Sequence, residues 1–415
     1  MKLTNEIIAF LTNQRNLTAL LRGTCGAKGN IKATSLRVKP DMNVAFSWED
    51  ETTQLQGWGR VLWPVTQIKA EKPATMSARK MRVAEKLGIS YEVYTLPLIG
   101  FQVDGEPLLI QWGSFVSDPS LAKRFARYVD KLDVKDLNDF KVLRYNPFRR
   151  IIFNVNNQVI RLAKEVKSAA FYTLWDDFKD SQLPVVDLLD AEPTAPAFEY
   201  VRGLDGERYL QLASPQQNEE FHQIAGRRFA QLHLVKPDFS QEGKETLQQE
   251  LLAAAPKILN QIEVHQGVLL PLATRGSVLA NVLKKELAQI AAQLKPLEGP
   301  LVLSHGDASA DQLIVVAENG THEMYLNDFD RMCLAPAALD LGSYLYVHAH
   351  TEVAENAFLR GYREVTGNVP EFASLQMGKL YAALQRLATP LRSAQPDWEK
   401  QIIAQINKLN KEYRI

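Results

Sequence analysis

Cysteine is scarce in this chain of 415 residues, which contains only Cys25 and Cys333. Two cysteines are too few for a disulfide framework, and they lack the spacing of a metal site. Long apolar runs are also missing, since no stretch approaches the ~18 apolar residues of a membrane span. The N-terminal sequence has no apolar core of a secretory signal. We therefore expect a cytoplasmic protein without a membrane partner.

The chain also lacks net charge, because 48 Lys and Arg residues balance 48 Asp and Glu residues. Nothing in that balance suggests nucleic acid as a partner. The remaining composition, with 46% hydrophobic and 23% charged residues, is that of an ordinary globular protein. Its length allows about two or three domains and an ample core.

One segment, Ser304–Gly342, combines a strand pattern with several acidic residues. Two apolar runs, Gln312–Ala317 and Glu323–Asn327, are separated by the turn sequence Glu318-Asn319-Gly320. Asn-Gly between two such runs is the strongest short-range signal for a β-hairpin. The sequence therefore predicts a hairpin over residues 312–327.

Carboxylates stand at both ends of this predicted hairpin. Asp307 precedes the first strand, and Asp328 and Asp330 follow the second. Because a hairpin brings its two ends together, we expect these side chains to converge. Phosphoryl transfer uses such an arrangement, in which one carboxylate orients the attacking hydroxyl and others hold Mg²⁺ on the nucleotide phosphates.

The order of these residues resembles the catalytic segment of the aminoglycoside phosphotransferase and choline kinase superfamily, which has a protein-kinase-like fold. The family pattern is a His-Gly-Asp, an amide residue five positions later, an Asp-aromatic-acid triplet, and a Pro followed by Asp-Leu. The corresponding residues here are His305-Gly306-Asp307, Gln312, Asp328-Phe329-Asp330, Pro336 and Asp340-Leu341. The usual amide is Asn, and the Gln in its place resembles a maltokinase-like bacterial branch.

The resemblance implies a role for each residue of the segment. Asp307 would orient the acceptor hydroxyl and receive its proton, and His305 would orient the catalytic loop through hydrogen bonds. Asp328 and Gln312 would bind Mg²⁺. Asp330 would either assist the metal or fix the loop. An alternative is that these carboxylates serve only as turn and capping residues.

A small kinase-like N-lobe is expected upstream, and its loop over the phosphates contains no glycine. We predict strands at Lys141–Tyr145, Arg149–Val155 and Gln158–Lys164, with the loop Asn146–Phe148 between the first two and a helix over Ser168–Phe178.

Cations of this N-lobe are the predicted phosphate contacts. By strand alternation and by resemblance to the family pattern, Arg161 is the first candidate and Lys164 the second, with Arg149 at the loop. Arg161 could instead be a solvated strand residue. In the following segment, the backbone of Glu199 and Val201 would contact the adenine at a hinge between lobes, although a strand ending in a glycine turn explains this sequence equally well.

The first ~140 residues read as a β-rich cap with an internal repeat. Leu36–Phe46 parallels Leu143–Phe153 through a strand, a proline turn and a second strand. Either an N-lobe motif was duplicated, as in the cap of maltokinases, or the match reflects a common strand–turn–strand unit. The position that corresponds to the cation falls near Trp63, so we expect the cap not to bind nucleotide.

Helices dominate the remaining chain, and His233 at the end of one of them is expected to be structural. The predicted helices are Gln217–Leu234, Lys244–His265, Gly276–Leu297, Leu341–His350, Val353–Thr366, Leu375–Ala394 and Trp398–Tyr413. We expect an α/β (α+β), two-lobed, protein-kinase-like fold with a cap at 1–138, an N-lobe at 139–203 and a helical C-lobe at 204–415.

The resulting prediction is an O-phosphotransferase that uses ATP or GTP with Mg²⁺. Its acceptor would be a small hydroxylated metabolite, with a sugar or an amino sugar favoured by the resemblance. The alternative is a catalytically inactive kinase-like protein that binds nucleotide or acts as a scaffold. The sequence indicates no oligomeric state.

Overall fold

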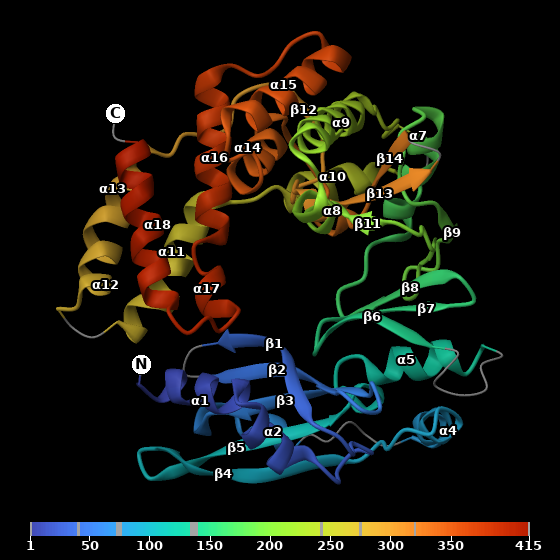
Figure 1. Ribbon diagram of the computed structural model, residues 1–415, viewed down its shortest axis with the longest axis vertical. Coiled ribbons are helices and arrows are strands. Elements are labelled where there is room, and N and C mark those ends of the chain that lie inside the picture. The colour runs from blue at the N-terminus through green and yellow to red at the C-terminus, as the bar shows by residue number, and fades with distance from the viewer. Residues whose placement is uncertain are drawn as a thin grey trace.

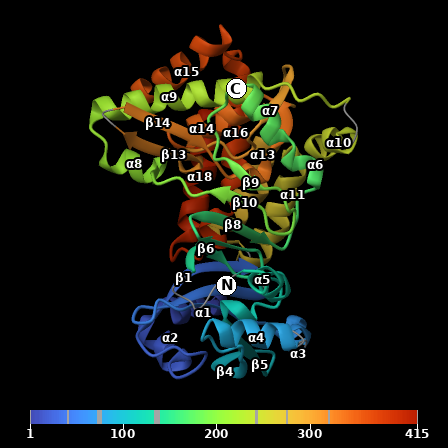
Figure 2. The same cartoon turned by 90° about the vertical axis from the view of Figure 1, so that its right-hand side faces the viewer.

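The computed structural model describes residues 2–39, 42–71, 77–132, 140–240, 244–273, 276–318 and 321–413. Figures 1 and 2 show two regions stacked along the long axis, with a β-rich N-terminal part at one end and a helical part at the other. None of the described helices is long and apolar enough to cross a membrane.

The N-terminal region is an antiparallel sheet of five strands in the order β1-β2-β3-β5-β4. These five strands agree with the β-rich N-terminal part that the sequence predicts. The elements of this region, which we call the cap, are α1 (Lys2–Thr12), α2 (Gln14–Leu21), β1 (Ile31–Lys39), β2 (Asn43–Asp50), β3 (Gln56–Leu62), α3 (Ile68–Glu71), α4 (Ala78–Lys86), β4 (Val93–Val103), β5 (Glu106–Ser114) and α5 (Ala122–Val129).

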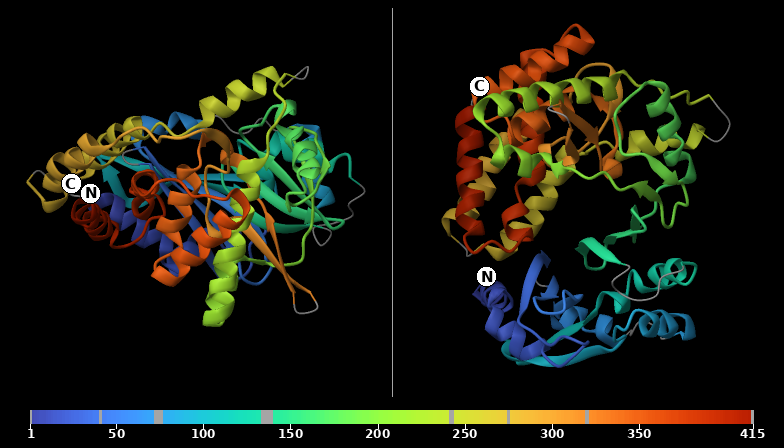
Figure 3. Two further views of the ribbon diagram at one scale, coloured as in Figure 1. Left: turned by 90° about the horizontal axis from the view of Figure 1, so that it is seen from above. Right: turned by 45° about the vertical axis from the view of Figure 1, so that its right-hand side comes forward.

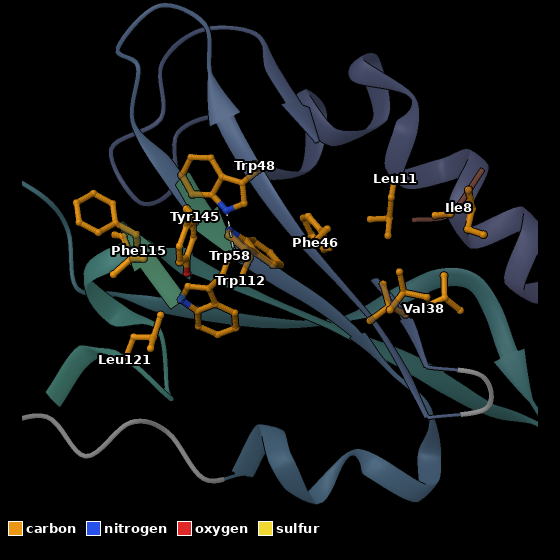
Figure 4. Packing of buried hydrophobic residues seen from close by; sticks show 14 of the residues in the cluster. Ile8, Leu11, Val38, Phe46, Trp48, Trp58, Trp112, Phe115, Leu121 and Tyr145 are labelled. Carbon is orange, nitrogen blue, oxygen red and sulfur yellow. Dashed lines mark hydrogen bonds between the residues drawn. The ribbon is translucent and has the colours of Figure 1, made fainter. Parts of the chain in front are cut away.

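Large aromatic side chains fill the core of the cap. Trp48, Trp58 and Trp112 are all buried, and the Nε1 atom of Trp48 donates to the carbonyl oxygen of Trp58 over 3.1 Å. Figure 4 shows Tyr145, which belongs to the next sheet, lying among these tryptophans. The cap and the second sheet therefore share one hydrophobic core.

The second sheet also has five strands, in the order β6-β7-β8-β10-β9. It repeats the strand order of the cap, and in both regions two described helices lie between the third and fourth strands in chain order. Its elements are β6 (Lys141–Asn146), β7 (Arg150–Val155), β8 (Gln158–Ala163), α6 (Ala169–Tyr172), α7 (Leu174–Asp180), β9 (Leu188–Asp190) and β10 (Ala197–Glu199).

Strand register matches between the two sheets as well. Lys39 pairs with Asn43 at the end of the first hairpin, and Asn146 pairs with Arg150 at the equivalent place. On the third strands, Ala45 faces Arg60 just as Ile152 faces Arg161. By this register, Arg60 occupies the place in the cap that Arg161 occupies in the second sheet, three residues before the expected position near Trp63.

Helices of the C-terminal region follow the predicted apolar periodicity, but two of the predicted runs are divided near a proline. Lys244–His265 is split before Pro256, since the residue ahead of a proline disfavours the helical conformation. Leu375–Ala394 is split between Arg386 and Thr389, and Pro390 lies in the first turn of the next helix, where its missing N–H group is tolerated. The helices are α8 (Gly206–Leu212), α9 (Pro215–Leu234), α10 (Glu245–Ala254), α11 (Ile258–Leu269), α12 (Val278–Asn281), a π-helical turn (Val282–Glu286), α13 (Leu287–Gln293), α14 (Ala338–Val347), α15 (Glu352–Thr366), α16 (Phe372–Arg386), α17 (Thr389–Arg392) and α18 (Trp398–Glu412).

The predicted hairpin is confirmed. Strands β13 (Leu313–Glu318) and β14 (Thr321–Leu326) pair antiparallel from Leu313 opposite Leu326 to Glu318 opposite Thr321. The tip residues 319 and 320 lie outside the described residues. Short strands flank the hairpin, with β11 (Leu204–Asp205) pairing with β13 and β12 (Leu301–Ser304) pairing with β15 (Cys333–Pro336).

C-terminal helices return to the cap. Figure 1 and the right panel of Figure 3 show α17 and α18 descending toward β1 and α1. The Nε1 atom of Trp398 in α18 donates to the side-chain oxygen of Asn5 in α1 over 3.0 Å, and α17 packs next to β1. The cap therefore contacts both the second sheet and the helical region. The proposed boundary at residue 138 lies outside the described residues, and the three-part division stays a prediction.

Candidate active site

A cavity of about 540 Å³ lies between the second sheet and the β13–β14 hairpin. Its apolar walls include Ile152 and Val159 from the sheet and Ile314 from the hairpin. Its polar residues include Arg161, Gln312, Asp328 and Asp330. The predicted N-lobe and the predicted catalytic hairpin thus enclose one space, of the size that small-molecule ligands occupy in proteins.

The segment after β10 forms one edge of this cavity. Both Glu199 and Val201 line it, as the hinge prediction requires. The Glu199 amide donates to the carbonyl oxygen of Asp187 over 2.9 Å, whereas Val201 makes no backbone hydrogen bond to any described residue. Val201 therefore has a free amide and a free carbonyl with which to bind the edge of a planar base.

The loop that carries His305, Gly306 and Asp307 is held by Asp340, a fully buried carboxylate in the first turn of α14. Its Oδ2 atom accepts from the amide of His305 over 2.5 Å, and its Oδ1 atom accepts from the amide of Gly306 over 2.9 Å. Gly306 has a φ of +78°, and a Cβ atom there would lie 2.1 Å from the carbonyl oxygen of Arg331. Only glycine fits this position without displacing the backbone that carries Arg331.

Burial alone would raise the pKa of Asp340, but the hydrogen bond and charge of His233 lower it, with further contributions from His305 and the Gly306 amide. The Nε2 atom of His233 lies 3.1 Å from Asp340, and its Nδ1 atom lies 2.9 Å from the hydroxyl of Tyr362. These contacts lie beneath the loop rather than in the cavity. His233 therefore has the structural surroundings expected of it.

Two arginines hold Asp307 in place. Arg331 Nη1 lies 3.2 Å and Arg386 Nη2 lies 3.3 Å from the Oδ1 atom of Asp307. Arg386 also donates to the hydroxyl of Ser343 over 3.2 Å. No described residue hydrogen-bonds to the Oδ2 atom, so this oxygen is free to accept a proton from a bound hydroxyl. The sequence did not single out Arg386, because it lies 79 positions from Asp307 in the chain.

The three residues predicted to bind metal come together at the base of the hairpin. Asp328 and Asp330 both form ion pairs with Arg150, at 3.2 Å and 2.7 Å, and Asp330 also pairs with Arg161. The side-chain Nε2 atom of Gln312 donates to Asp311 over 3.0 Å. The side-chain Oε1 atom of Gln312 has no partner among the described residues.

Electrostatics favour the ionised form of this site. Burial would raise the pKa of Asp328, but the charge and hydrogen bonds of Arg150 outweigh it, and His305 and Arg161 lower it further. Asp328 has a φ of +56°, a left-handed conformation that is uncommon outside glycine and that turns the chain from β14 into the Phe329–Arg331 turn. The carboxylate is therefore held charged at the cavity wall.

Of the predicted phosphate cations, the structure brings Arg161 to the cavity and leaves Arg149 and Lys164 outside its lining. Arg149 lies in the turn before β7 and Lys164 just after β8, where strand alternation no longer directs them to the site. Arg144 and Lys167, which the sequence did not single out, line the cavity, and Arg150 pairs with Asp328 and Asp330. Arg150 was identifiable in principle, since it shares a strand face with Ile152 opposite Arg161.

Donor chemistry at the site suits Mg²⁺, although no group of three or more His, Cys, Asp or Glu residues that could hold a metal occurs in the described parts of the chain. Asp328, Asp330 and Gln312 supply two carboxylates and one neutral carbonyl oxygen. Magnesium prefers such oxygen ligands and commonly takes one or two carboxylates together with substrate phosphates. A bound ion would share these carboxylates with Arg150 and Arg161.

Comparison with known proteins adds a family match. The family model described as the phosphotransferase enzyme family matches residues 158–396, which include the whole hairpin and the part of the cavity wall from Val159 onward. No curated protein matches the sequence significantly.

Solved structures resemble this fold at low identity. APH(2″)-IIa in complex with gentamicin has a TM-score of 0.50 at 13% identity, covering 69% of this chain and 96% of that chain. A choline/ethanolamine kinase family protein from Mesorhizobium loti has a TM-score of 0.44 at 15% identity, covering 66% and 88%. Ethanolamine kinase from Plasmodium vivax has a TM-score of 0.45 at 14% identity, covering 69% and 86%. The expected kinase-like fold with a β-rich N-terminal region is confirmed.

Proposed function

The chain belongs to the phosphotransferase enzyme family, and we propose that it transfers the γ-phosphoryl group of ATP or GTP to a hydroxyl group of a small molecule. The observation that carries this proposal is the placement of Asp330, which borders both the nucleotide-sized cavity and a second cavity that Gly306, the residue before Asp307, also lines. A carboxylate between two ligand-sized spaces is the arrangement that transfer between two substrates requires.

In the reaction, the hydroxyl oxygen of the acceptor forms a bond to the γ-phosphorus. The bond from that phosphorus to the bridging oxygen breaks, and its electron pair leaves with the nucleoside diphosphate. Asp307 orients the hydroxyl and receives its proton at the free Oδ2 atom. Because an ordinary alcohol is a very weak acid, this proton moves late, and orientation is the larger contribution of Asp307.

The nucleotide would occupy the cavity of about 540 Å³. Val201 would bind the base through its free backbone groups. Arg161 is suited to the phosphates because its Nε atom is buried and lacks a hydrogen-bond partner among the described residues. An arginine binds phosphate through two parallel N–H groups, so Arg161 and Arg150 can replace the lysine that kinases use.

Asp328 and Gln312 would hold Mg²⁺, with Asp330 assisting. The ion, when bound, neutralises charge on the phosphates during transfer. In its absence Arg150 and Arg161 balance the same carboxylates. Mg²⁺ would therefore compete with these arginines for the carboxylates, and the phosphates would compete with the carboxylates for the arginines. Because each ligand frees the partner that the other needs, we expect nucleotide to bind more tightly when Mg²⁺ is present.

The alternative is a non-catalytic nucleotide-binding or scaffold protein. The arginine pairs on Asp328 and Asp330 and the glycine-free turn before β7 favour it. The retained Asp307 with its free oxygen favours catalysis, since a scaffold has no chemical need for it. A sugar remains the proposed acceptor and the maltokinase-like branch the proposed subfamily. The cap equivalent of Arg161, Arg60, is bound to the side chain of Gln111 at 2.7 Å and 3.0 Å, so we propose that the cap does not bind nucleotide.

Thermal unfolding with ATP or GTP, each with and without Mg²⁺, tests the proposal first. A nucleotide at a hundred times its Kd adds about 2.7 kcal/mol to the free energy of unfolding, which a melting curve detects. Asp307→Asn should then abolish transfer while nucleotide affinity stays within a few-fold, because a base acts in the transition state. Asp328→Asn should instead weaken the Mg²⁺-dependent part of binding. Unchanged melting with every nucleotide would favour the scaffold.

A further inference from the structure

The second cavity, of about 360 Å³, lies next to the catalytic loop. Gly306 and Asp330 border it on the loop side. Arg331 lines it from the Phe329–Arg331 turn, Gln385 from α16 and Arg392 from α17. Since the nucleotide cavity also includes Asp330, an acceptor in the second cavity would be close to the γ-phosphate. Its volume suits a metabolite the size of a substituted sugar.

Arginine gathers around this cavity from four separate parts of the chain. Arg331 and Arg392 line it, and Arg149 of the β6–β7 turn and Arg37 of β1 in the cap are close enough to Arg392 to repel it electrostatically. Burial lowers the pKa of Arg392, and repulsion from Arg331 and Arg149 lowers it further. Burial and then repulsion from Arg392 act in the same direction on the pKa of Arg37. The whole chain carries no net charge, so this cluster is a local concentration of positive charge.

Nearby carboxylates do not neutralise the cluster. Asp330 is already paired with Arg150 and Arg161. Asp307 is shared between Arg331 and Arg386 through a single oxygen. Arg392, Arg149 and Arg37 form no ion pair with any described residue, although Glu165 offsets part of the repulsion on the last two. Positive charge therefore remains for a ligand.

A histidine with a ring nitrogen unpartnered among the described residues also lines this cavity. His265 of α11 lines the cavity, and its Nε2 atom lies 2.9 Å from the carbonyl oxygen of Leu384. A carbonyl oxygen can only accept, so Nε2 carries the proton and Nδ1 is left as an acceptor. That Nδ1 atom is buried and has no partner among the described residues. Burial and repulsion from Arg392 lower the pKa of His265, which keeps the ring neutral. A ligand hydroxyl would satisfy it.

We propose that the second cavity is the acceptor site and that its acceptor is anionic, a small polyhydroxylated molecule bearing a phosphate or carboxylate group. Arg392 and Arg331 bind the anionic group, one hydroxyl donates to His265 Nδ1, and another hydroxyl attacks the γ-phosphorus beside Asp307. A cationic amino sugar is excluded, because the arginines would repel its positive charge. This inference rests on the proposed phosphotransferase function.

The test measures ligand binding to the protein saturated with Mg²⁺ and AMP-PNP, which fills the nucleotide site including its γ-phosphate. The probes are inorganic phosphate, glucose 6-phosphate, glucuronate, glucose and glucosamine at matched ionic strength, followed by melting temperature and calorimetry. The variant is Arg392→Gln, whose side chain forms no described ion pair. The matched control is Arg363→Gln, which removes the same charge from an exposed position on α15.

We expect the phosphate- and carboxylate-bearing probes to bind about tenfold or more tightly than glucose, and glucosamine not to bind, since charge-assisted pairs with arginine are strong. Arg392→Gln should remove most of that preference, and Arg363→Gln should keep it. Equal binding of glucose and glucose 6-phosphate, or no Arg392-dependent effect of any anion including inorganic phosphate, would overturn the proposal.

Two further outcomes distinguish an acceptor-binding role of Arg392 from a γ-phosphate-binding role, and failure of this inference from failure of the proposed function. If Arg392→Gln weakened AMP-PNP binding far more than ADP binding, Arg392 would hold the γ-phosphate, and the acceptor assignment would be wrong. If neither nucleotide bound the wild-type protein, the proposed function itself would fail before the acceptor is tested.

Discussion

The hydroxyl of Tyr145 in β6 donates to the Oδ2 atom of Asp118, in the connection between β5 and α5, over 2.8 Å. Asp118 is fully buried, and the same oxygen accepts from the amide of Phe148 over 2.8 Å. Its other oxygen accepts from the amides of Ser120 and Leu121 at 2.8 Å and 3.2 Å. One carboxylate of the cap therefore fixes the β6–β7 turn, which we propose covers the nucleotide phosphates.

Asp118→Asn should loosen that turn. The new amide would present N–H groups where only acceptors fit, and at least one backbone N–H would lose its partner, at about 1–3 kcal/mol. We expect a melting temperature several degrees lower and weaker binding of Mg²⁺-nucleotide. Asp130→Asn is the control, since Asp130 pairs with Arg79 near the surface of the same region and such pairs contribute little. Equal effects of the two substitutions on nucleotide binding would show that Asp118 does not link the cap to the nucleotide site.

Arg161 and Lys164 can be compared directly. Arg161 lines the nucleotide cavity with an unpaired Nε atom, whereas Lys164 is exposed and outside the lining. Arg161→Gln should weaken nucleotide affinity about tenfold or more, because it removes a charge-assisted contact to phosphate. Lys164→Gln should change it less than about twofold, as for other exposed charges. The reverse order in titration calorimetry would make Lys164 the phosphate ligand.

Gly306 and Gly367 form a second matched pair. Their φ angles are +78° and +80°, but a Cβ at Gly306 meets the Arg331 backbone, whereas at Gly367 nothing lies within 4 Å. Gly367→Ala should cost only the ~1–2 kcal/mol of the left-handed conformation. Gly306→Ala should cost more and should also lower kcat at least about tenfold, because the displaced backbone carries Arg331 and its contact to Asp307. Melting temperatures and kcat of both variants decide this.

Stability should fall in mild acid because of buried histidines. Burial lowers the pKa of His222 to about 4, with repulsion from His350 adding to it. An unfolded histidine titrates near 6.5, so between these values the unfolded chain holds more protons and the free energy of unfolding decreases as the pH decreases. At pH 5.5 the loss is roughly 1.4 kcal/mol for this residue.

Melting temperatures at pH 7.5 and pH 5.5 measure that loss. His222→Gln should lower stability at both values, since it breaks the 2.8 Å contact with the Tyr344 hydroxyl. It should nevertheless lose less between the two pH values than the wild-type protein does. Parallel pH profiles for the two proteins would show that His222 is not the titrating group.

Local patterns in the sequence were enough to predict the β-hairpin of the candidate catalytic segment. The Asn-Gly turn between two apolar runs predicted the hairpin, and the hairpin brings Gln312 and Asp328 to the same cavity, because strand pairing is a local, periodic property. The convergence of Asp307 with these two residues stays a prediction. The same periodicity located most helices. It failed where proline interrupts an otherwise apolar pattern, as at Pro256, since hydrophobic spacing alone continues through such a residue.

Only the tertiary structure decided which cations serve the site. Arg150 rather than Arg149 reaches the carboxylates because one residue along a strand reverses the direction of the side chain. Arg386, Arg392 and His265 come from helices far along the chain, and no short-range pattern predicts that they meet Asp307 or its cavity. The contact of Asp118 with Tyr145 depends in the same way on how two sheets pack. Sequence periodicity specifies the helices and strands. The charge at the proposed acceptor site depends instead on contacts between residues that are distant in the chain.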